Sequence, residues 1–138
     1  MEKKIIKVDV SWTEDNFCCA WADENLGTVL VTAKTLDKLK KEFKEALRLH
    51  IDGCVADGDE VPRYLMDGDY DVEYILDTAA LLRDAEEYTT IAAISRASGI
   101  NQKQLSHYAS GLKHPRPLQV ERIKAGLHRI GTCLMALS

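Results

Sequence analysis

The spacing of apolar residues changes along this chain, and that change limits the fold more than any other feature of the sequence. In the first third, apolar side chains such as Ile6, Val8 and Val10 alternate with polar ones, which is typical of strands that bury one face. Turns at Thr13–Asn16 and Asn25–Gly27 divide this region into three short strands. Short turns between successive strands predict an antiparallel meander.

A helical spacing replaces the alternation after the third strand. Thr35 is predicted to cap a helix that ends at Gly53, and its apolar face recurs at three- and four-residue steps: Leu36, Leu39, Phe43, Leu47 and Ile51. Residues 56–71, rich in Asp and Gly, are predicted to form a loop. A fourth strand follows, with alternating Val72, Tyr74 and Leu76. Residues 1–76 are therefore predicted to be a β-β-β-α-β domain.

Residues 77–138 show no strand signal and are predicted to form four helices. The apolar residues of the first helix are Ala80, Leu81, Ala85 and Tyr88. The second helix spans Ile91–Ala97 behind a Thr89 or Thr90 cap, and the third begins at the N-cap Asn101 and continues to Gly111. The last helix has the stripe Ile123, Leu127, Ile130 and Leu134. The predicted fold class is α+β, with an all-α domain at 77–138.

Charge is distributed unevenly along the chain. The net charge of −4 combines a +6 segment at residues 89–138, with seven Lys/Arg and one acid, and a −10 segment at residues 1–88, with 11 Lys/Arg and 21 acids. A basic surface suits a polyanion such as DNA, whereas an acidic one suits water or a basic protein. Two domains with different partners are therefore predicted.

The cysteines and the hydropathy pattern point to a cytoplasmic protein. Cys18 and Cys19 are adjacent while Cys54 and Cys133 stand alone, so neither a metal-binding pair nor a disulfide framework is expected. The N-terminus has no hydrophobic leader, and no apolar run is long enough to span a bilayer. No membrane association and no cofactor or metal are expected.

Residues 91–111 have the pattern of a helix-turn-helix. Ser95 is a small residue where two helices cross, and Gly99 tolerates the positive φ of a tight turn. The pair is locked by the apolar residues Ile94, Ile100, Leu105 and Tyr108. The outer face of the second helix is then polar and is formed by Gln102, Lys103, Ser106 and His107. Such a face can reach base edges in the major groove of DNA.

The stretch from Asp77 to about Ile130 resembles the repressor-type domain of phage repressors and small bacterial regulators. The resemblance includes a G-x-x-P-R-like ending at Gly111–Pro117, although Ser98 stands where that family usually has an apolar residue. By position it implies base contacts from Gln102, Lys103 and His107, and Ser106 on the same outer face is a fourth candidate. Phosphate contacts are expected from Arg96, Asn101, Lys113 and Arg116, since most protein–DNA hydrogen bonds go to the backbone.

A β-β-β-α-β domain followed by such a module resembles the HicB antitoxins of bacterial type II toxin–antitoxin systems, whose sheet is a degenerate ribonuclease-H-like one. The resemblance implies that residues 1–76 bind and block a small basic RNA-cleaving toxin, HicA. It also implies that residues 77–138 repress the protein's own operon. Opposite charge would speed encounter with a basic toxin.

Other interpretations are open. One is a stand-alone transcriptional regulator whose acidic domain senses a small molecule or binds another protein, and another is an adaptor that binds no DNA. An enzyme is not expected, because Asp9 on the polar side of the first strand has Cys18, Ala20, Leu30 and Thr32 as expected neighbours instead of further acids.

The apolar tail at residues 133–137 has two interpretations. It completes the helical core, which we favour at this point, or it packs across a two-fold axis. A homodimer or higher even oligomer is expected in either case, because helix-turn-helix proteins bind paired half-sites.

Overall fold

The structure is a computed structural model that describes residues 3–138, and its chain divides into two compact units. The first comprises the residues up to Asp77, and the second comprises Thr78–Ser138. Strands and helices share the first unit, whereas the second contains helices alone among its assigned elements. The predicted α+β class is confirmed at this level. We call the two parts the sheet unit and the helical unit.

The sheet unit is built on four strands: β1 (Lys4–Thr13), β2 (Asn16–Asp23), β3 (Gly27–Ala33) and β4 (Tyr70–Leu76). Their order in the sheet is β3-β2-β1-β4. The first three strands form the predicted antiparallel meander, while β4 pairs with β1 in parallel. A parallel neighbour requires a crossover connection, and the long helix α1 (Leu36–Ala56) lies within it.

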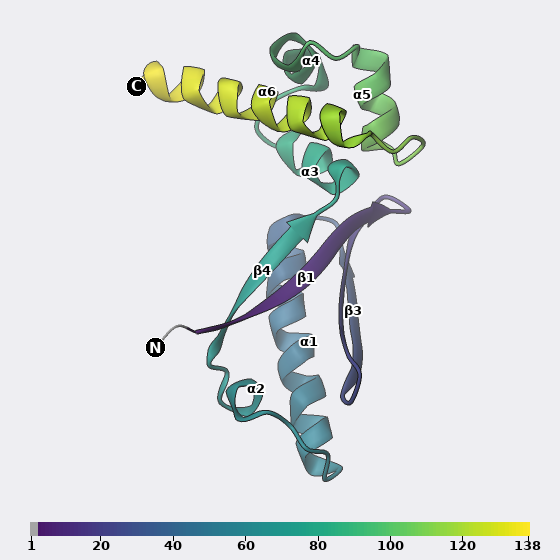
Figure 1. Ribbon diagram of the computed structural model, residues 1–138, viewed down its shortest axis with the longest axis vertical. Coiled ribbons are helices and arrows are strands. Elements are labelled where there is room, and N and C mark those ends of the chain that lie inside the picture. Colours follow the sequence, from purple (N-terminus) through teal and green to yellow (C-terminus); the bar gives the residue numbers. More distant parts are fainter. Residues whose placement is uncertain (1–2) are drawn as a thin grey trace. The chain divides into compact units, whose positions relative to one another are not determined.

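One face of the sheet is covered by α1 (Figure 1). The buried side chains alternate along the strands as the sequence predicts, and they meet an apolar stripe along α1. The largest fully buried side chains on the strands and α1 are Val8, Val10, Cys19, Leu39, Phe43, Leu47 and Ile51. The tight turn between β1 and β2 places both Glu14 and Asp15 at positive φ, as a two-residue hairpin of this hand requires.

Helix α1 begins as predicted but ends later. The Thr35 hydroxyl accepts a hydrogen bond from the Lys38 N–H at 3.2 Å, which caps the first turn. The predicted end at Gly53 is wrong, because the helix continues to Ala56. Cys54 extends the buried stripe one step beyond Ile51, so packing against the sheet outweighs the low helix propensity of a single glycine.

The predicted loop at residues 56–71 is wrong in part, because it contains the short helix α2 (Arg63–Asp67). Pro62 precedes its first residue, and Gly68 ends it in the left-handed conformation at φ 69°. Leu65 is its buried residue. One apolar residue in one turn produces no periodic signal, and for that reason the sequence pattern does not predict α2.

The helical unit consists of α3 (Thr78–Ala85), α4 (Ile91–Ser98), α5 (Gln102–Ala109) and α6 (Pro117–Ala136). All four helices contribute to one core cluster: Leu82, Ile94, Ile100, Leu105, Tyr108, Ala109 and Ile123. Thr90, not Thr89, caps α4, and Asn101 caps α5 as predicted.

Two expectations for this core are wrong. Tyr88 lies beyond the end of α3 and is exposed, whereas Leu82, which the pattern did not include, is fully buried together with the predicted Ala80. Leu134 is exposed as well, and so is every residue from 131 to 138. The apolar tail therefore does not complete the helical core, since the packed stripe of α6 stops at Ile130.

Candidate nucleic-acid interface

The connection between α4 and α5 is short and held by side-chain hydrogen bonds. Gly99 ends α4 in the left-handed conformation at φ 74°, as predicted. The Ser95 hydroxyl donates to the carbonyl of Ile100 at 2.6 Å, and the N–H of Ile100 donates to the Ser98 hydroxyl at 3.2 Å. Both bonds join a serine of α4 to the backbone of Ile100. They fix the direction in which α5 starts.

Ser98 stands at a position that is usually apolar in the repressor-type domains that this segment resembles. The packing of α4 against α6 explains the small residue there. A Cβ added at Gly126 of α6 would lie 2.9 Å from the Cβ of Ser98, so the two helices nearly touch at this pair. A large apolar side chain at position 98 has no room beside α6. The small residues Ser98 and Gly126 therefore form a close helix contact that the sequence pattern did not predict.

Helix α5 is held on one side and capped at both ends. Its buried side is formed by Leu105, Tyr108 and Ala109. At the start, the Asn101 carboxamide oxygen accepts from the N–H groups of Lys103 and Gln104 at 2.8 and 3.4 Å. At the end, the Arg83 guanidinium donates to the carbonyl of Ala109 at 2.9 Å, where a cation also complements the helix dipole. This fixed placement suits a helix that must present side chains in register to a partner.

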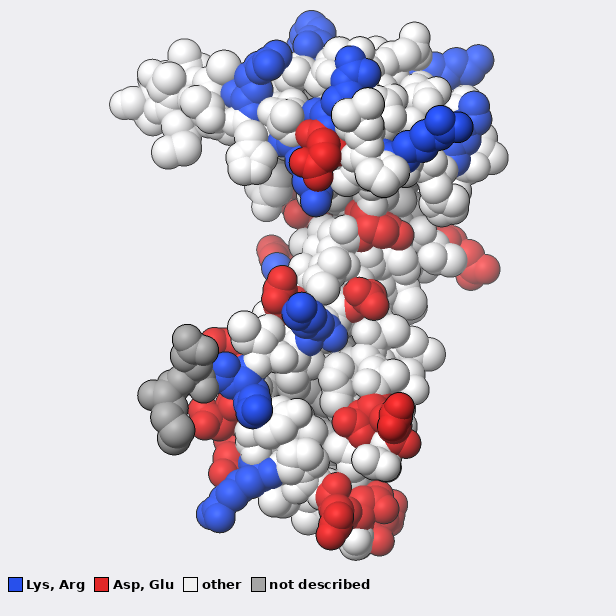
Figure 2. All heavy atoms as spheres, in the orientation of Figure 1, with Lys and Arg blue, Asp and Glu red and all other residues white. Residues whose placement is uncertain are grey.

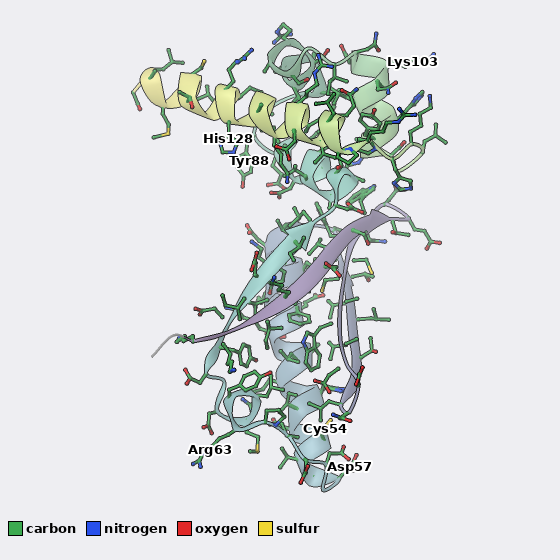
Figure 3. All side chains as sticks on the ribbon, viewed as in Figure 1. Cys54, Asp57, Arg63, Tyr88, Lys103 and His128 are labelled. Carbon is green, nitrogen blue, oxygen red and sulfur yellow. The ribbon has the colours of Figure 1, made fainter. Side chains whose placement is uncertain are left out.

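The opposite side of α5 is polar. Gln102, Lys103 and Ser106 are exposed, and His107 is half-buried. At 3.6 residues per turn these four residues occupy an arc of about 140°, away from the buried side. Lys103 points outward from the unit (Figure 3). The four predicted base-contacting residues therefore share one accessible face.

The four predicted phosphate-contacting residues are exposed and come from different elements. Arg96 lies on α4, Asn101 precedes α5, and Lys113 and Arg116 lie in the segment between α5 and α6. The Asn101 oxygen is engaged in the cap, so its amide group is the part left to meet a phosphate. Figure 2 shows Lys and Arg gathered over the helical unit and Asp and Glu numerous over the sheet unit.

Sequence reasoning missed two arginines of α6 that lie beside the α4–α5 turn. Arg129 donates to the carbonyl of Ala97 at 3.2 Å, and the Arg122 guanidinium lies 3.6 Å from where a Cβ on Gly99 would be. Both are exposed. They are seven residues apart and therefore on one helix face, which is the signal that could have identified them. They add positive charge next to α5.

The uncovered face of the sheet has a shallow hollow of about 300 Å³, lined by residues that include Asp9, Ser11, Cys18, Ala20 and Ile75. The strand register places Ala20 and Ile75 beside Asp9. No group of three or more potential metal ligands occurs among residues 3–138. On the covered side, burial raises the pKa of Cys19 to about 11 and that of Tyr74 to about 12, so both groups are neutral at physiological pH.

The chain has no match among protein-family models, curated proteins or solved structures. Within the described residues, no helix is both long and apolar enough to cross a membrane.

Proposed function

We propose that the helical unit is a helix-turn-helix domain that binds operator DNA through α5. The observation that carries the proposal is the polar, exposed arc of α5, which packs rigidly on its other side and is capped at both ends. A helix of this kind fits the major groove, where Gln and Lys side chains can hydrogen-bond to base edges. Arg96, Lys113 and Arg116 supply the surrounding phosphate contacts.

A salt titration tests the electrostatic part of this proposal. The full chain is titrated onto duplex DNA from upstream of its own gene, and the observed affinity is expected to fall steeply with salt. Lys113→Ala and Arg116→Ala should each reduce the slope of log affinity against log salt by about one. Lys44→Ala on α1 is the matched control and should leave the slope unchanged. Equal slopes for all four proteins would contradict the proposed phosphate contacts.

We further propose that the whole chain is an antitoxin of the HicB type, which neutralises a HicA-like RNA-cleaving toxin and represses its own operon. The charge of the sheet unit supports this proposal, since it holds ten Lys/Arg and 18 acids, a net charge of −8. Such a surface attracts a basic toxin. Its element order, three strands, a long helix and a fourth strand with the short helix α2 before it, is close to the β-β-β-α-β order on which the family resemblance rests.

Co-expression tests the antitoxin proposal. The chain is expressed with the neighbouring reading frame, expected to encode about 60–80 residues rich in lysine, near the lower size limit of a stable domain. Co-purification and loss of RNA cleavage are the expected results. Gln102→Ala/Lys103→Ala should retain toxin binding, because both residues belong to the helical unit. A neighbouring protein that neither binds nor loses its activity would refute the antitoxin role and leave DNA binding standing.

The hollow on the uncovered sheet face favours a second candidate, a stand-alone regulator that senses a small molecule. Its volume of about 300 Å³ lies at the lower end of ligand pockets. Ala20→Phe would fill the hollow and changes no residue of the helical unit. A change in DNA affinity caused by this variant alone would favour the sensor, and unchanged DNA affinity would favour the antitoxin.

A further inference from the structure

The end of α6, from Gly131 on, has an apolar surface that the rest of the helical unit leaves uncovered. Every residue from 131 to 138 is exposed, and Met135 retains 78% of its surface. No charged residue occurs from Ile130 to Ser138. A few helical turns without packing are marginal in water, so a partner surface would stabilise this segment.

A groove of about 540 Å³ runs along the same part of α6. Leu81 of α3 lines one side, and the remaining lining residues are Lys124, Leu127, His128, Gly131, Thr132 and Met135 of α6. Steps of three and four residues place all six on one helix face. The groove therefore has an apolar floor, with the side chain of Met135 beside it.

The two glycines of α6 differ in what surrounds them. An added Cβ at Gly126 would lie 2.9 Å from Ser98, so that glycine is explained by packing within the unit. In the described part of the chain, nothing lies within 4 Å of a Cβ added at Gly131. A glycine inside a helix costs about 1 kcal/mol relative to alanine, and on this face it allows another helix backbone to come close.

We propose that the α6 helices of two copies of this chain pack antiparallel across a two-fold axis at Gly131. Met135 of each copy then enters the groove of the other. The arrangement also places Lys124 of each copy near the negative end of the opposite helix dipole, whereas a parallel packing would set the two Lys124 side chains against each other.

Three arguments select a second copy as the occupant. A groove and a protruding side chain on one face are self-complementary, as a two-fold interface requires. The uncharged segment offers nothing to attract a partner of opposite charge. A dimer would also present two α5 helices to paired half-sites, and this last argument alone rests on the proposed function.

Sedimentation equilibrium of the full chain without DNA tests the proposal. The chain is expected to dimerise, and Met135→Glu should raise the dimer dissociation constant by at least about tenfold, because a charge would be buried in the groove. Leu118→Glu is the matched control: Leu118 is 73% exposed on the same helix but more than four turns from Met135. Its dissociation constant should stay within about twofold of the unmodified chain's.

Gly131→Ala gives a second, independent readout. The added methyl group meets nothing in a single copy and should raise the melting temperature of the dilute monomer. The same variant should weaken the dimer, because the backbones can no longer approach as closely.

A monomeric chain at all concentrations, or a Met135→Glu variant that dimerises as tightly as the control, would overturn the proposal. The sedimentation experiment contains no DNA, so its result does not depend on the proposed function. A chain that dimerises but binds no DNA in a separate assay would refute only the proposed function. Specific DNA binding by a strict monomer would refute only the dimer.

Discussion

Helices α1 and α6 are nearly equal in length, at 21 and 20 residues, but they are buried to very different extents. Helix α1 has a buried residue in every turn, from Leu36 to Cys54. Helix α6 has two buried residues, Ile123 and Gly126, and it is exposed from Gly131 to its end. The sheet unit thus completes the packing of its long helix within one chain, whereas the helical unit does not.

This difference indicates what each unit has left for partners. In the sheet unit, the free surface is the uncovered sheet face with its hollow and the surrounding acids. In the helical unit, it is the polar arc of α5 and the apolar end of α6. A polar arc suits DNA and an apolar end suits a protein surface, so the proposed DNA binding and the proposed dimer use two different surfaces of the helical unit.

Removing a large side chain from α1 should have the largest effect. Phe43 is fully buried and packs edge-on against Tyr74 at 6.2 Å between ring centroids. Phe43→Ala is expected to lower the free energy of unfolding of the sheet unit by about 3–5 kcal/mol, measured by urea denaturation. Leu49→Ala, on the exposed side of the same helix, is the control and should change it by less than about 0.5 kcal/mol. Similar losses for both would mean that α1 does not pack as described.

The crossing of α4 and α6 should be the next most sensitive point. Gly126→Ala would place a methyl group 2.9 Å from the Cβ of Ser98 and 3.0 Å from its backbone. Overpacking of this kind costs about 1–3 kcal/mol, partly offset by the better helix propensity of alanine. We expect a lower melting temperature for the helical unit, whereas an increase would show that the two helices can move apart freely.

The two helix starts should respond in opposite directions. Thr35→Ala removes the cap of α1 and should cost the sheet unit about 1 kcal/mol. Arg116 occupies the same position before α6 with no side-chain cap, so Arg116→Ser should stabilise the helical unit by about 0.5–1 kcal/mol. The same variant should weaken DNA binding, because it removes a proposed phosphate contact. A more stable variant with unchanged DNA affinity would remove Arg116 from the interface.

The reactivity of the cysteine thiols should differ between the two units, and it can be measured on the unmodified chain. Cys133 is exposed on α6, whereas Cys19 is buried under α1 with a pKa raised to about 11 by that burial. At pH 8 only about one in a thousand Cys19 thiols is ionised, and the thiolate is the reactive form. Alkylation followed by mass spectrometry should label Cys133 long before Cys19. Equal rates would show that the sheet core opens readily.

Local patterns predicted most elements of both units, because each such element has a repeating signal. The alternation of Ile6, Val8 and Val10, the glycine at position 99 and the Asn101 cap are all confirmed. The parallel pairing of β4 with β1 was not predicted, since it joins residues more than 60 positions apart. Helix α2 has one buried residue and hence no period.

The sequence predicted which residues form the candidate site, but it did not predict the contacts that hold α5 in place. The polar arc follows from helical spacing, which placed Gln102, Lys103 and Ser106 on one exposed face. The Arg83 bond to the end of α5 and the Ser98–Gly126 contact join different helices, and no spacing within one helix contains that information. The exposed end of α6 contradicts the interpretation that the sequence favoured, completion of the helical core, because an apolar stripe indicates burial without naming the surface that covers it.

The central claim is that the exposed arc of α5 reads base sequence. Its most direct test is the ratio of affinities for the upstream duplex and for a scrambled duplex of equal length, measured by fluorescence anisotropy at one salt concentration. For the unmodified chain we predict a ratio of about 10³ or more. For Gln102→Ala/Lys103→Ala we predict a ratio near one and an unchanged melting temperature, because both side chains are exposed. A double variant that keeps the full ratio would contradict the claim.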